Sequence, residues 1–261
     1  MKKKQLASMI LVLAVAVSTV FASVNVAAAD SAESKSVTLQ DSAKDQNGKQ
    51  TEKPGKYVLK DKKNKAAGVR ARAASVDSMT YDWDDATQTL TVSGTGKVVG
   101  NYDTSYPLSA YKNKARKIIL QDGITEIGQV AFNGCQSLKT MKIPDTVTKI
   151  GCSAFERCSS LEEVRLPQNL TEMEYAVFSG CEKLQDILIP GSLESLEMRM
   201  FENCTSLRNV TIENGVQTIG IEAFENCVNL KEIEIPESVS YVGNSAFRGC
   251  TGLKSVTFSG E

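Results

Sequence analysis

Histidine is absent from all 261 residues of this chain. Without an imidazole, the Ser-His and Cys-His pairs that activate many protein nucleophiles cannot form, and the commonest metal ligand is missing. No CxxC motif is present, and tryptophan occurs once. These absences predict a protein that is not an enzyme and has no catalytic residue, no cofactor and no metal site.

Carboxylates are the remaining candidates for acid–base chemistry or for binding a hard cation. Glu162 and Glu163 are neighbours on an expected strand, so their side chains point to opposite faces and cannot converge on one substrate. Asp82, Asp84 and Asp85 lack the glycine and the final glutamate of an EF-hand loop. We expect these aspartates to crown a hairpin turn, where aspartate is favoured, with a calcium site as the alternative.

Long apolar runs are missing beyond the first 29 residues. Lysines at positions 2–4 precede an apolar run at residues 9–20, and alanines at 27–29 form a small-residue cleavage motif. The run is too short for a membrane-spanning helix, which needs ~20 apolar residues. Residues 1–29 are therefore predicted to be a secretory signal peptide, which places the mature protein outside the cell, secreted or associated with its surface.

The most regular feature of the chain is a repeat of 23 residues, in which phenylalanine, cysteine and leucine recur at constant positions. A constant period in the range of roughly 20 to 50 residues is typical of a solenoid, in which stacked units bury a core that no single unit could bury. The structural ladder consists of Phe132, Phe155, Phe178, Phe201, Phe224 and Phe247, with Cys135, Cys158, Cys181, Cys204, Cys227 and Cys250.

Each unit reads as two short strands separated by a turn. Met141 and Ile143 alternate with a variable residue, which is the period of a strand, and Pro144 ends that strand in a turn. Residues 147–150 alternate again, whereas the stretch around Phe132 lacks alternation and is expected to form a tight helical turn. The predicted fold is a β-rich repeat solenoid with short helical turns.

The repeat resembles the BspA-like leucine-rich repeats of bacterial surface antigens, through units such as Ile143-Pro144-x2-Val147-x2-Ile150-Gly151-x2-Ala154-Phe155-x2-Cys158-x2-Leu161. The resemblance covers about residues 115–258 and implies a right-handed leucine-rich-repeat superhelix with a parallel sheet. Residues 81–85 and 90–96 resemble the N-terminal cap of that family, a β-hairpin that leads into the first coil. The resemblance also implies a secreted or surface-displayed binding protein, in some members an adhesin.

Composition divides the chain into a signal peptide (1–29), a Lys-rich linker (30–74), an N-terminal β-hairpin cap (75–114) and the solenoid (115–261). The linker holds 11 basic and 6 acidic residues without periodicity, a composition typical of disorder. We expect a tether, with contact to anionic wall polymers as the alternative. Residues 75–261 hold 16 basic and 25 acidic residues, a net charge of −9, which argues against nucleic acid as a partner.

The six ladder cysteines are expected to be free and buried, because each occupies a position in an apolar column. Cys152 belongs to a different column, whose mixed composition indicates the surface. We expect its thiol to be reactive or to form a dimer. The other members of this column are Gln129, Tyr175, Met198, Ile221 and Asn244.

The variable residues of the first strand are expected to face outward in two columns. Solenoids use such extended faces for recognition, so the columns are the candidate binding face for a host or bacterial surface protein or glycan. They lack the aromatic enrichment of interaction hot spots, so a structural spacer or surface-coat component without a selective ligand is the alternative. The candidate residues are Lys117, Thr140, Lys142, Glu163, Arg165, Asp186, Leu188, Asn209, Thr211, Glu232 and Glu234.

The apolar core is expected to be open at both ends of the stack unless other residues cover it. Tyrosines 102, 106 and 111, with Pro107 and Leu108, are expected to cover the first coil, with sugar stacking as the alternative role. The chain stops at Glu261, soon after Phe258, without a similar segment. An uncovered apolar end predicts end-to-end self-association, unless the chain is a truncated form of a longer one.

Overall fold

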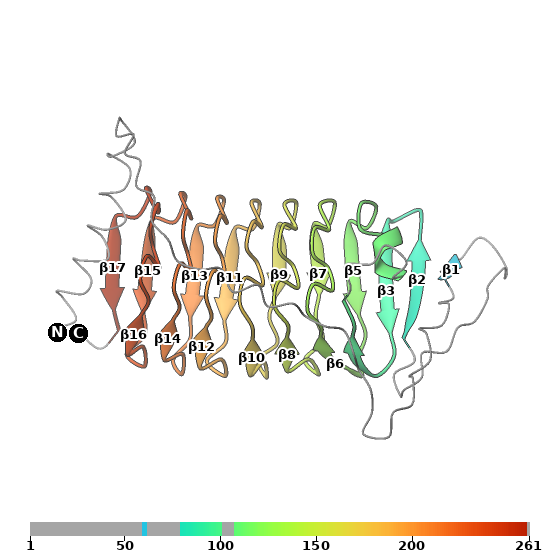
Figure 1. Ribbon diagram of the computed structural model, residues 1–261, viewed down its shortest axis with the longest axis horizontal. Helices are drawn as coiled ribbons and strands as arrows, with labels where there is room; N and C mark the ends of the chain where they lie inside the picture. Colours follow the sequence, from blue (N-terminus) through green and yellow to red (C-terminus); the bar gives the residue numbers. More distant parts are fainter. Residues whose placement is uncertain (1–58, 62–78, 101–106, 260–261) are drawn as a thin grey trace, which may run out of the picture.

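The computed structural model describes residues 59–61, 79–100 and 107–259, which form a stack of coils along one axis (Figure 1). The predicted signal peptide and most of the Lys-rich linker lie outside the described residues. Every coil contributes one strand to each of two parallel sheets, and the coils repeat every 23 residues. The predicted solenoid is therefore confirmed.

The first sheet, here the main sheet, takes one strand from each coil. Its strands pair in parallel and without a shift in register, so that Asp186 lies opposite Asn209, 23 residues later. Its hydrogen-bonded ladder is interrupted between β9 and β11 and between β13 and β15. The strands are β5 (Lys117–Leu120), β7 (Thr140–Lys142), β9 (Glu163–Arg165), β11 (Asp186–Ile189), β13 (Asn209–Ile212), β15 (Glu232–Ile235) and β17 (Ser255–Phe258).

The second sheet is built from the shorter strand of each coil. Its ladder runs from β4 to β10 and again from β12 to β16, with one interruption between β10 and β12. The strands are β4 (Gly96–Val98), β6 (Ile124–Ile127), β8 (Lys149–Ile150), β10 (Glu172–Met173), β12 (Ser195–Leu196), β14 (Thr218–Ile219) and β16 (Tyr241–Val242).

Turns form the remaining side of each coil. The backbone N–H of Phe155 donates to the carbonyl of Val177 in the next coil at 2.9 Å. Ser153 and Arg157 have φ angles of 53° and 59°, in the left-handed region. The position of Arg157 is held in other coils by the residues that adopt this region most readily: Gly134, Gly180, Asn203, Asn226 and Gly249.

The prediction of short helical turns was wrong in detail. Single hydrogen-bonded turns replace them, because two left-handed residues in each coil interrupt any run of helical backbone. Within the described ranges, the 3-10 helix η2 (Pro107–Ala110) is the one helical element.

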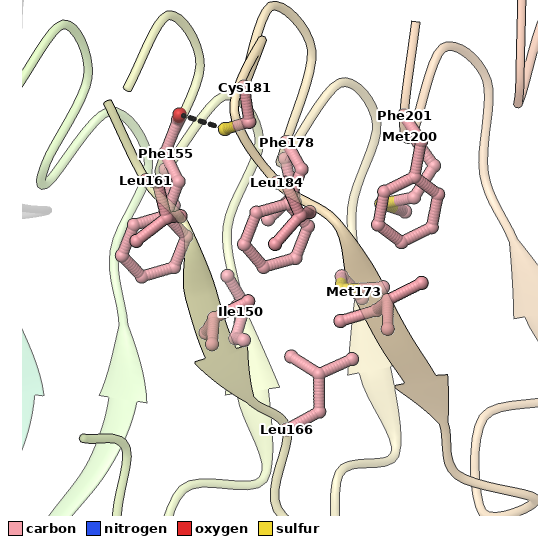
Figure 2. Close-up of a cluster of buried hydrophobic side chains, with 14 of the residues drawn as sticks. Ile150, Phe155, Leu161, Leu166, Met173, Phe178, Cys181, Leu184, Met200 and Phe201 are labelled. Carbon is pink, nitrogen blue, oxygen red and sulfur yellow. Dashed lines mark hydrogen bonds between the residues drawn. The ribbon is translucent and has the colours of Figure 1, made fainter. Parts of the chain in front are cut away.

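The phenylalanines form a continuous stack through the core, as predicted. Consecutive ring centroids lie between 5.3 and 5.6 Å apart, and consecutive ring planes are inclined by 11° or less. The spacing follows the separation of neighbouring strands, ~4.8 Å. Figure 2 shows Phe155, Phe178 and Phe201 in one row, and all three are fully buried.

The ladder cysteines are free and buried, which confirms the prediction. Each thiol from Cys158 onward donates to the carbonyl of the phenylalanine 26 residues earlier, at 3.0 to 3.3 Å. Burial raises the pKa of the Cys181 thiol well above its ordinary value and that of the Cys204 thiol to about 12. Cys181 and Cys204 therefore hold neutral thiols at physiological pH.

The expectation for Cys152 was wrong. Tyr175, Met198 and Ile221 of the same column are exposed, but Cys152 is only 5% exposed. Cysteine carries a single heavy atom beyond Cβ, so its short side chain is covered by neighbouring residues, whereas the longer side chains of this column reach the solvent. The backbone N–H of Cys152 donates to the carboxylate of Glu174 at 2.8 Å. A reactive or dimer-forming thiol at this position is not supported.

The N-terminal hairpin is present and extends the main sheet. β2 (Thr80–Asp84) pairs antiparallel with β3 (Thr89–Ser93), and β3 pairs in parallel with β5. Asp84 accepts a hydrogen bond from the N–H of Ala86 in the hairpin turn, as expected. Within the linker only β1 (Leu59–Asp61) is described, where it pairs with β2, so these three residues are not without structure.

Aromatic side chains cover the first coils. The Trp83 and Tyr111 ring centroids are 5.0 Å apart, and both residues are buried together with Leu108. This agrees with the covering role predicted for Leu108 and Tyr111. Tyr102 and Tyr106 lie outside the described residues.

Candidate binding faces

The two predicted columns lie side by side on the outer face of the main sheet. The alternation in β11 turns Ile187 and Ile189 into the core and leaves Asp186 and Leu188 outside. Among the candidate residues only Thr140 is half-buried, and the others are exposed: Lys117, Lys142, Glu163, Arg165, Asp186, Leu188, Asn209, Thr211, Glu232 and Glu234. The strand registers place equivalent residues of neighbouring coils opposite each other.

Charge on this face changes along the solenoid. The basic side chains of Lys117, Lys142 and Arg165 come from the first three coils, whereas Glu232 and Glu234 come from the last full coil. The positive end lies near the N-terminal hairpin. A partner of the whole face would need the opposite distribution of charge.

A hollow of about 470 Å³ opens beside the acidic end of the main sheet. It coincides with the interruption between β13 and β15, and Thr211 and Glu234 from the two columns line it. Glu234 also accepts a hydrogen bond from the hydroxyl of Ser259 at 2.6 Å. The sequence does not predict this hollow, because the interruption of the ladder has no signal in the repeat pattern.

A second exposed feature lies beside the second sheet and was not predicted as a site. Tyr175, Met198 and Ile221 occupy the same position in three successive coils, and they are 48%, 40% and 43% exposed. We call these three residues the apolar stripe. Its signal is present in the sequence as three apolar residues at the 23-residue spacing within a surface column.

The apolar stripe adjoins a position where the repeat departs from its own pattern. Glu174 and Glu197 stand where the other coils have glycine: Gly128, Gly151, Gly220 and Gly243. The glycine allows close approach of the coils, because a Cβ on Gly151 would lie 2.5 Å from the backbone nitrogen of Gln129.

Glu174 and Glu197 meet at the one contact in the described second sheet where neither coil has the glycine. The ladder is interrupted there, between β10 and β12. A hollow of about 300 Å³ lies at this contact, and Glu172, Glu194 and Tyr175 also line it.

The carboxylates of this hollow are only partly compensated. The Lys149 ammonium lies 2.8 Å from Glu172 and 3.6 Å from Glu174, and the hydrogen bond with Glu172 raises the pKa of Lys149. Within the described ranges, Glu194 and Glu197 have no ion pair. We call this group the acidic hollow.

Solved structures of bacterial leucine-rich repeat proteins resemble this fold. A leucine rich cell surface protein from Faecalibacterium prausnitzii A2-165 shares 28% identity and a TM-score of 0.56. The match covers 72% of this chain and 56% of that protein, so the chain spans little more than half of its length. The leucine rich repeat protein of T. pallidum shares 25% identity and a TM-score of 0.55, over 67% of this chain and 88% of that protein.

Comparison with curated proteins gives no match. The model of the BspA type leucine rich repeat region matches in six copies, over residues 107–231 and 184–261. These residues include the Phe and Cys ladders and both sheets of the solenoid, so the chain belongs to the family of BspA type leucine rich repeat proteins.

Proposed function

We propose that this protein is a non-catalytic binding module of the cell surface, and that the outer face of the main sheet binds a protein or glycan partner. The observation that supports it best is the largely exposed face made by the two columns, whose residues are in register wherever neighbouring strands of the main sheet pair. Extended faces of this type are the recognition surfaces of many solenoid proteins.

The proposed location rests on two further observations. Residues 1–29 have the composition of a secretory signal peptide, and the structurally similar F. prausnitzii protein is a cell surface protein. No helix in the described ranges is long and apolar enough to cross a membrane. For retention at the surface, our candidates are the Lys-rich linker and anionic wall polymers.

The alternative function is a spacer or coat component without a selective ligand. It is favoured by the composition of the columns, because no single residue type recurs across the coils in the way a repetitive ligand would require. Leu188 is the one large apolar side chain that is exposed on this face in the described part of the chain. The two functions predict different binding behaviour.

Binding of the full chain to a panel of host matrix proteins, mucins and bacterial wall polymers at physiological salt distinguishes them. The test variant reverses charge on the face through Glu163→Lys, Asp186→Lys and Glu232→Lys. The matched control makes the same changes at exposed carboxylates off the face, Asp122→Lys, Asp145→Lys and Glu182→Lys.

We expect saturable binding to one member of the panel that the face variant loses and the control variant retains. If no member binds, or if both variants lose binding equally, the proposed binding face is wrong. Binding that disappears when the linker lysines are replaced and when salt is raised would instead assign the contact to the linker.

A further inference from the structure

We propose that the apolar stripe and the acidic hollow together form a second docking face, separate from the main sheet, for a Lys- or Arg-rich segment of a partner protein. This proposal does not depend on the function of the main sheet. It rests on the coincidence of exposed apolar side chains, an opened contact between coils and uncompensated carboxylates.

The exposed apolar side chains are concentrated rather than scattered. Single exposed apolar residues are normal on protein surfaces, but the stripe brings three into adjacent coils. At ~4.8 Å per coil, Tyr175 and Ile221 are about 10 Å apart along the stack. An extended polypeptide advances about 3.3 Å per residue, so about three of its residues span this length.

The hollow beside the stripe has an identifiable cause. At the contact between β10 and β12, Glu174 and Glu197 each present a Cβ and a negative charge where other contacts have at least one glycine. The ladder is open at this contact and closed at the next one, where the N–H of Gly220 donates to the carbonyl of Leu196 at 2.7 Å. Glu174 and Glu197 thus keep the two coils apart at this contact and place carboxylates in the space between them.

The charge of the opening selects a cationic occupant. Four glutamates line the hollow, and one ammonium group, that of Lys149, compensates two of them. In the described part of the chain, no group of three or more carboxylates or thiols is arranged to hold a metal ion. An ammonium or guanidinium group complements these carboxylates, because it can interact with separate carboxylates through several donors.

Tyr175 connects the two parts of the face. This residue is 48% exposed, lines the hollow and begins the stripe. A Lys or Arg side chain in the hollow would lie within reach of this ring, and cation–π contacts contribute about 0.5–1 kcal/mol at exposed sites. An apolar neighbour in the same segment would cover Met198 and Ile221. Basic and apolar residues in one extended segment thus match the face.

A direct test measures binding of a labelled peptide of four Lys-Leu-Ser repeats to the full chain at 0.15 M salt. Glu194→Gln with Glu197→Gln should raise Kd about fivefold, and Tyr175→Ser with Met198→Ser and Ile221→Ser should raise it about tenfold. The matched controls lie off both proposed faces and are Asp122→Asn with Glu182→Gln for charge and Val228→Ser for apolar exposure. The controls should leave Kd unchanged.

The proposal fails if the controls shift Kd as much as the test variants. It also fails if a peptide of Lys-Ser-Ser repeats binds as tightly as the Lys-Leu-Ser peptide, because attraction to the acidic body alone would then explain both results. Hydrogen exchange of the wild-type chain gives an independent result if a variant does not fold. The peptide should slow exchange at residues 171–176 and 194–199, and slowing confined to other residues would contradict the proposal.

Discussion

The thiol of Cys181 donates a hydrogen bond of 3.3 Å to the carbonyl oxygen of Phe155, one coil earlier in the stack (Figure 2). The same carbonyl accepts the backbone N–H of Cys158 at 3.1 Å. Each ladder cysteine from Cys158 onward thus joins the turn of the preceding coil to its own. This explains why a small side chain with a hydrogen-bond donor suits this column better than alanine or valine.

Replacing Cys181 by alanine should lower the free energy of unfolding by about 1–3 kcal/mol, because it leaves a cavity and removes one hydrogen bond. Serine keeps a donor but places a hydroxyl in an apolar column, so it should also destabilise. Urea unfolding measures both variants. Equal stability of wild type and Cys181→Ala would show that neither the packing nor the hydrogen bond of this thiol stabilises the fold.

Alkaline pH should destabilise the protein through its buried thiols. Burial raises the pKa of Cys204 from 9.0 to about 12, so between these values the folded chain keeps a proton that the unfolded chain releases. The stabilisation is complete below pH 9 and is lost as pH rises toward 12, at about 1.4 kcal/mol per pH unit for one thiol. Urea unfolding at pH 8 and pH 10 measures the slope.

The matched variant for this pH dependence is Cys204→Ala. Its free energy of unfolding should fall less steeply above pH 9 than that of the wild type, because one titrating group has been removed. All other side chains are the same in both proteins, so the difference between the two slopes reports on Cys204. Identical slopes would exclude Cys204 as a source of the alkaline destabilisation.

The phenylalanine stack predicts a large effect at an interior ring. Phe178 stacks on both Phe155 and Phe201 and is fully buried. Phe178→Ala should lower the free energy of unfolding by about 3–5 kcal/mol. Phe178→Leu keeps most of the side-chain volume and should lower it clearly less. Chemical denaturation measures both. A loss below 1 kcal/mol for Phe178→Ala would mean that neighbouring coils collapse into the space.

The sequence predicted the parts of the fold that follow from the period alone. The constant step of the phenylalanines placed Phe178 over Phe155, and the alternation of residues such as Ile187 and Leu188 separated core from surface. Cys152 was misplaced because column composition reports the average exposure of a position, whereas burial of one member also depends on the length of its side chain.

Residues of the second docking face can be recognised in the sequence, but the hollow that they line cannot. Glu174 and Glu197 stand out against the repeated glycine. Only the distance between coils shows that a Cβ at this position would lie 2.5 Å or so from the neighbouring backbone. The origin proposed for the interruption and for the acidic hollow rests on that distance, which no pattern of residue types contains.

Restoring glycine at one of these positions should close the opened contact. With Glu197→Gly, the backbone N–H of residue 197 is expected to donate to the carbonyl of Met173, as Glu174 donates to Ile150 at 3.0 Å and Gly243 to Ile219 at 2.7 Å. Exchange of that amide should slow by at least about tenfold, since a structural hydrogen bond replaces contact with water. Amide hydrogen exchange followed by NMR measures it.

Glu197→Ala separates the two causes of the opening. Alanine removes the negative charge but keeps the Cβ, so if the coils are held apart by sterics, the amide of residue 197 should exchange as fast as in the wild type. Slowing in both variants would show that repulsion between Glu174 and Glu197 keeps the contact open. Wild-type exchange rates in the glycine variant would contradict the role given to glycine in close coil packing and, with it, the origin proposed for the hollow.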